Sequence, residues 1–83
     1  MENKAIVIFR IHKREFETDL EIPLDISATD LVIALNTAYE LNIDVSNVKN
    51  CYLQAENPIA LLKGNKLLKD YGVRNGTIIN YTK

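Results

Sequence analysis

The sequence has very little of the chemistry on which most enzymes and metal proteins depend. Its 83 residues include one cysteine, Cys51, one histidine, His12, and no tryptophan. A single cysteine excludes an intramolecular disulfide and a cysteine-rich metal site. The sequence also has no glycine-rich phosphate loop, paired-histidine zinc motif or calcium loop. We therefore expect no catalytic residues, no cofactor and no metal ligands, and we predict that the protein is not an enzyme.

Long apolar runs are missing as well. No stretch approaches the roughly 18 apolar residues of a membrane span. The first four residues lead directly into a β-like run, without the apolar segment and small-residue cleavage site of a signal peptide. These absences predict a cytoplasmic protein that does not insert into a membrane, and the lone thiol fits a reducing compartment.

The chain carries almost no net charge. Ten lysines and arginines against eleven acidic residues give −1, which supplies no attraction to nucleic acid or anionic lipid. The basic groups at 12–14 and at Lys63, Lys66 and Lys69 are interpreted as solvated turns. A regulator that binds RNA or another polyanion through these lysines is kept as an alternative, and steep salt dependence of binding would identify it.

The patterning predicts one domain over residues 1–83. Residues 15–24 alternate between apolar and acidic side chains, which indicates a strand with one buried face, and Pro23 indicates an edge position. Ser27 can cap a helix whose stripe includes Leu31, Leu35, Ala38 and Tyr39 and for which Asn42 is the expected stop. The other expected strands span residues 5–11, 50–55, 59–62 and 77–81.

The segment 68–79 is the most specific part of the sequence. A short apolar turn, an Asp-Tyr pair at 70–71, a glycine-punctuated loop and a final strand follow one another, as at the end of a ubiquitin-like domain. We therefore predict an α+β fold of the ubiquitin-like β-grasp type, with a mixed four- to five-stranded sheet and one main helix packed on one face. No Gly-Gly pair occurs, so we expect a binding module. A ubiquitin-like modifier, a sulfur-carrier relative and a stand-alone regulatory binding domain remain alternatives.

The chain resembles the YukD/EsaB-type ubiquitin-like proteins of the type VII (Ess/Yuk) secretion systems of Gram-positive bacteria. The resemblance is carried by residues 18–23, 31–35 and 68–76 and by the ending without Gly-Gly. It implies a cytosolic accessory or regulatory factor that acts by contact in the secretion of WXG100-type substrates. It also implies protein partners among the membrane or ATPase components of the machine, and no catalytic motif.

Strand phase predicts where such a partner binds. If Val7 and Phe9 face the helix, then Ile6 and Ile8 face the other side of the sheet. The same argument applied to the later strands exposes Tyr52, Gln54, Ile78 and Asn80. With strands one, five and three adjacent, we expect one apolar patch on the open face. Such a patch typically marks an interface with a partner, or a weak homodimer. The expected patch consists of Ile6, Ile8, Tyr52 and Ile78.

Overall fold

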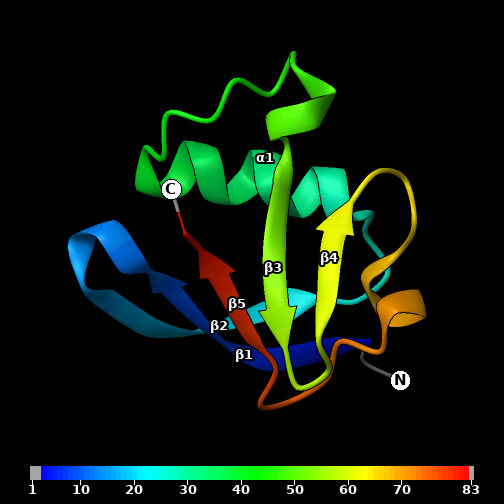
Figure 1. Ribbon diagram of the computed structural model, residues 1–83. Helices are drawn as coiled ribbons and strands as arrows, with labels where there is room; N and C mark the ends of the chain where they lie inside the picture. The colour runs from blue at the N-terminus through cyan, green and yellow to red at the C-terminus, as the bar shows by residue number, and fades with distance from the viewer. Residues whose placement is uncertain (1–2, 83) are drawn as a thin grey trace.

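The fold is one five-stranded sheet with a single α-helix lying across one of its faces (Figure 1). The structure is a computed structural model that describes residues 3–82, apart from the side chain of residue 48. The strands are β1 (Lys4–Ile11), β2 (Phe16–Pro23), β3 (Tyr52–Glu56), β4 (Ala60–Lys63) and β5 (Ile78–Tyr81); the helix is α1 (Ala28–Tyr39), and the 3-10 turns are η1 (His12–Arg14), η2 (Val48–Asn50) and η3 (Leu68–Tyr71).

The strand order is β2-β1-β5-β3-β4, which places the first and last strands side by side in the middle of the sheet (Figure 1). β1 and β5 run parallel, whereas the other neighbouring pairs are antiparallel. A mixed sheet with this order and one helix on one face confirms the predicted β-grasp architecture. The order also confirms the expectation that the first, last and third strands are adjacent, since β5 lies between β1 and β3.

The alternation predicted for β1 is present. Val7 and Phe9 are fully buried beneath the helix, while Ile6 on the opposite face is 53% exposed. The acidic strand β2 pairs with β1 in the matching phase, so Leu20 lies beside Val7 on the core side. The burial of alternate residues therefore assigns one face of the sheet to the core and leaves the other uncovered.

α1 begins where the sequence predicts. The Ser27 hydroxyl accepts a hydrogen bond from the backbone N–H of Asp30 at 3.1 Å, and Asp30 places negative charge in the first turn. The expected stop at Asn42 is wrong, because the helix ends at Tyr39 and Glu40 takes the left-handed conformation. Arg14 on the β1–β2 hairpin explains the earlier end, since its guanidinium donates to the carbonyls of Tyr39 and Glu40 at 2.6 and 2.7 Å.

The buried stripe of α1 differs slightly from the predicted one. Leu31, Val32 and Leu35 are buried, but Ala38 is exposed. Tyr39, which was also predicted for this stripe, does pack against the sheet, with its ring centroid 5.1 Å from that of Phe9. At this end of the helix the stripe therefore continues through Tyr39, while Ala38 lies on the exposed flank.

We expect Ser27→Ala to lower the free energy of unfolding by about 1 kcal/mol, because the N–H of Asp30 loses its side-chain acceptor. Urea denaturation followed by circular dichroism measures the change. Ser27→Asp is the matched control, since aspartate also caps helices and retains most of the stability. Equal midpoints for Ser27→Ala and the wild type would show that the cap contributes nothing.

The segment 68–79 forms a series of turns that are held to the sheet by hydrogen bonds. The backbone N–H of Gly76 donates to the Ile6 carbonyl at 2.9 Å, and Asn75 Oδ1 accepts from the Ile6 N–H at 2.8 Å. Tyr71 in η3 donates its hydroxyl to the Lys63 carbonyl at 2.6 Å. These bonds fasten the last loop to β1 and to the edge strand β4, so the final strand enters the centre of the sheet in one register.

Candidate interaction surface

The face of the sheet opposite α1 is the candidate functional surface, and we call it the open face. The side chains that reach it come from all five strands, because every strand contributes alternate residues. Its central members are Ile6, Ile8, Arg10 and His12 near or on β1, Ile78 and Asn80 on β5, Tyr52, Gln54 and Glu56 on β3, and Leu61 on β4.

Three of the four predicted patch residues lie together. Ile8 pairs with Ile78 across the parallel β1–β5 ladder, and Ile6 precedes Ile8 by two residues on the same face. Ile6 is exposed, whereas Ile8 and Ile78 are half-buried. We call these three residues the isoleucine strip. It provides a continuous apolar surface at one end of the open face.

Tyr52 lies at the other end of the open face. Gln54 on β3 is opposite Asn80, and Glu56 is opposite Ile78, so Tyr52 is four residues along the strand from the level of Ile78. At about 3.3 Å per residue this separation is roughly 13 Å along the sheet. The structure therefore does not bring Tyr52 into contact with the isoleucine strip, because polar side chains of Gln54 and Asn80 lie between them.

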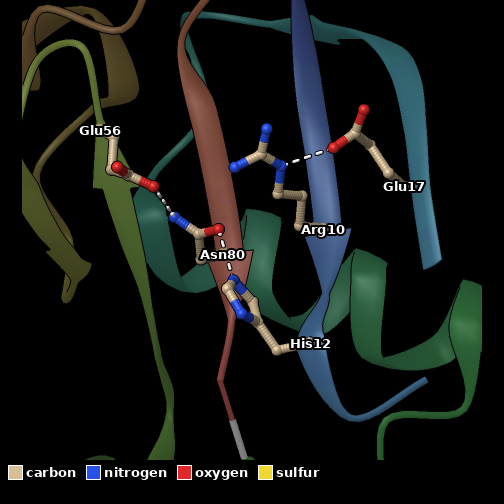
Figure 2. Close-up of polar contacts among 5 residues, drawn as sticks. All are labelled: Arg10, His12, Glu17, Glu56 and Asn80. Atoms are coloured by element: carbon tan, nitrogen blue, oxygen red, sulfur yellow. Dashed lines mark hydrogen bonds and ion pairs between the residues drawn. The ribbon is translucent and has the colours of Figure 1, made fainter. Parts of the chain in front are cut away.

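Asn80 was expected to be exposed, and that expectation is wrong: the residue is only 5% exposed although it faces the open side. Its amide lies between two neighbours, with Nδ2 donating to Glu56 Oε2 at 2.8 Å and Oδ1 lying 2.8 Å from His12 Nε2 (Figure 2). A carboxylate can only accept, so the amide nitrogen must face Glu56 and Oδ1 must accept from His12 Nε2–H. Glu56 on β3 and His12 at the start of η1 thus cover Asn80 from its two sides.

A further polar contact lies beside this group. Arg10 Nε and Glu17 Oε1 form an ion pair at 2.6 Å across the β1–β2 ladder (Figure 2). Both side chains are well exposed, and exposed pairs of this kind contribute about 0–1 kcal/mol to stability. The pair does neutralise one of the acidic residues of β2 on this face.

A hollow that the sequence pattern did not predict lies on the open face beside the edge strand β4. Its volume is about 510 Å³, and its apolar wall is formed by Ile59, which is 90% exposed, and Leu61, which is 43% exposed. The alternation of side chains along β4 could have predicted the apolar wall, because burial of Leu62 places Leu61 on the opposite face of the sheet. The hollow is lined by His12, Gln54, Ala55, Glu56, Ile59, Ala60, Leu61, Asn80 and Thr82.

Other chemistry is sparse in the part of the chain that the structure describes. Residues 3–82 contain no group of three or more His, Cys, Asp or Glu side chains placed to hold a metal ion. Cys51 is buried, and burial raises the pKa of its thiol, which disfavours the reactive thiolate. Among those same residues no helix is long and apolar enough to cross a membrane.

Strand order, helix position and the uncovered sheet face together define a ubiquitin-like β-grasp domain. The ubiquitin-like domain of tubulin-binding cofactor B matches with a TM-score of 0.74 at 24% identity, over 96% of this chain and 89% of that one. The ubiquitin-like domain of Dsk2 from Plasmodium falciparum gives 0.60 at 23% identity, over 93% and 96%. The ubiquitin-like domain of ECCD1, a type VII secretion system protein of Mycobacterium tuberculosis, gives 0.59 at 19% identity, over 96% and 98%.

The sequence identifies the family within this class of fold. The chain matches the family described as "WXG100 protein secretion system (Wss), protein YukD" over residues 6–80, and it belongs to that family. The predicted resemblance is therefore confirmed. No curated protein matches the chain at a significant level.

Proposed function

We propose that the protein is a non-catalytic interaction module that acts in the cytoplasm as an accessory or regulatory component of a WXG100-type, type VII secretion system. The observation that carries this proposal is the family match, which runs from residue 6 in β1 to residue 80 in β5. The fold shared with the ubiquitin-like domain of ECCD1 supports it. Partners of this class are the membrane or ATPase components of the secretion machine.

The proposed contact surface is the open face, centred on the isoleucine strip. Apolar side chains that are left exposed beside one another favour protein contacts, because burying them on a partner removes them from water. α1 covers the other face of the sheet and leaves this one free (Figure 1). Tyr52 contributes at the far end if the partner spans the whole face.

We expect Ile8→Asp to reduce capture of secretion-machine components at least tenfold, because the change places a charge in the middle of the strip. The measurement is an affinity pull-down from lysate of the bacterium that encodes the protein, with retained proteins identified by mass spectrometry. Ile33→Asp is the matched control: Ile33 is 40% exposed on α1, on the opposite side of the molecule.

Each variant is used only after urea denaturation shows cooperative unfolding. Equal capture by the wild type and Ile8→Asp would move the contact away from the strip. If secretion components are absent from every sample, the proposed role in secretion is contradicted. Sedimentation of the two variants distinguishes a weak homodimer, which Ile8→Asp would dissociate, from a contact with another protein.

A further inference from the structure

The lining of the hollow beside β4 includes the carboxylate of Glu56, which is held in place by a hydrogen bond from the buried Asn80. Glu56 accepts from the amide of Asn80, which is 95% buried and is itself held by His12 (Figure 2). A carboxylate held in this way loses little conformational freedom when a ligand binds it, so a partner gains more from contacting it. Glu56 Oε1 remains available to accept a second bond.

The charge at this position is uncompensated within the described part of the chain. The ion pair of residues 3–82 joins Arg10 to Glu17, and Glu56 has no such partner there. No lysine or arginine is among the residues that line the hollow. A cationic group of the partner would complement Glu56, while an anionic one would be repelled.

Glu56 also lies between two apolar surfaces. Its ladder partner on β5 is Ile78 of the isoleucine strip, and on its other side it lines the hollow together with Ile59 and Leu61. The hollow is large enough for one bulky side chain, and Ile59 in its apolar wall is the most exposed large hydrophobic residue among those that the structure describes. Apolar, acidic and apolar groups thus follow one another across the open face.

We infer that the open face binds a protein segment in which a lysine or arginine stands between two bulky apolar side chains. The basic residue binds Glu56, one apolar side chain covers the isoleucine strip, and the other enters the hollow against Leu61. This inference rests on the proposed function, because it describes the segment through which the partner of the open face would be recognised.

The test is selection of a random dodecapeptide library, displayed on phage, on the immobilised full-length chain. We expect selected peptides to be enriched in lysine or arginine flanked on both sides by Leu, Ile, Met or Phe. Leu61→Asp, which fills the hollow with charge, should abolish the selection. Peptides without basic enrichment, peptides equally retained by Leu61→Asp, or no peptides above background would each overturn the inference.

The role of Glu56 is measured on the best selected peptide by fluorescence polarisation. We expect Glu56→Gln to weaken its binding roughly threefold to tenfold, as for the loss of one charge-assisted hydrogen bond at a partly exposed site. Glu40→Gln removes an exposed carboxylate at the end of α1 and should leave the affinity unchanged. An unchanged affinity in Glu56→Gln would contradict the proposed pairing.

The two proposals fail in different ways. Secretion components captured by the wild type, lost in Ile8→Asp but fully kept in Glu56→Gln and Leu61→Asp would overturn the recognition of a basic segment and leave the proposed function intact. Selection of basic, apolar peptides with no secretion component in any pull-down would uphold the recognition chemistry and contradict the role in secretion.

Discussion

Replacing Phe9 with alanine will lower the free energy of unfolding by about 3–5 kcal/mol. Phe9 is fully buried on β1, and its ring lies 5.1 Å from that of Tyr39 on α1. Its removal leaves a cavity where the helix meets the centre of the sheet. A domain of this size has about 4–12 kcal/mol of stability, so the change removes a large part of it. Urea denaturation monitored by circular dichroism gives the value.

Phe9→Leu is the matched control for this prediction. Leucine keeps most of the buried apolar volume but loses the ring contact, so we expect a loss of about 1–2 kcal/mol. A Phe9→Ala protein with wild-type stability would mean that Phe9 is not a centre of the core. Because Phe9 faces the helix, neither change should affect the open face in protein that remains folded.

The second large effect is expected at Thr77, which is fully buried just before β5. Its hydroxyl accepts from the backbone N–H of Arg74 at 3.0 Å and donates to the carbonyl of Asn57 at 2.9 Å. Thr77→Val keeps the shape of the side chain but leaves both backbone groups without this partner. We expect a loss of about 2 kcal/mol, measured by the same denaturation experiment.

Thr77→Ser separates the hydroxyl from the methyl group. Serine keeps both hydrogen bonds and removes one buried methyl, which costs about 1 kcal/mol. The valine variant should therefore be the less stable of the two. The reverse order would show that packing of the methyl group, and not the two hydrogen bonds, is the main contribution of Thr77 to stability.

The parts of the fold that were predictable from sequence depend on local patterns. Alternation in 5–11 places Val7 and Phe9 on one side of the strand and Ile6 and Ile8 on the other, and the structure shows that Val7 and Phe9 are the core pair. Ser27 followed by Asp30 identifies the helix start, since the cap bonds a group only three residues away. The segment 68–76 identifies the fold, because its turns need particular residues at fixed spacing.

The parts that were not predictable depend on residues far apart in sequence. The helix ends early because Arg14, 25 residues before Tyr39, supplies donors to its last carbonyls. Tyr52 is separated from Ile78 by the antiparallel register of β3 and β5, which no local pattern specifies. The candidate site was therefore predicted in its apolar half, the isoleucine strip. Its acidic half, at Glu56, could be recognised only from the structure, which shows the contact with Asn80 and the hollow beside it.

The buried Asn80 affects the register in which β5 pairs with β1. A strand that slips by one residue moves every side chain to the opposite face. For β5, such a slip would place the Asn80 amide among the core side chains and turn Ile79, now 1% exposed, toward water. In that register the Asn80 amide would lose the hydrogen bonds to Glu56 and His12, and the Ile79 side chain would lose its apolar neighbours. Asn80 thereby makes mispaired arrangements of β1 and β5 costly and so favours the observed register of the two strands.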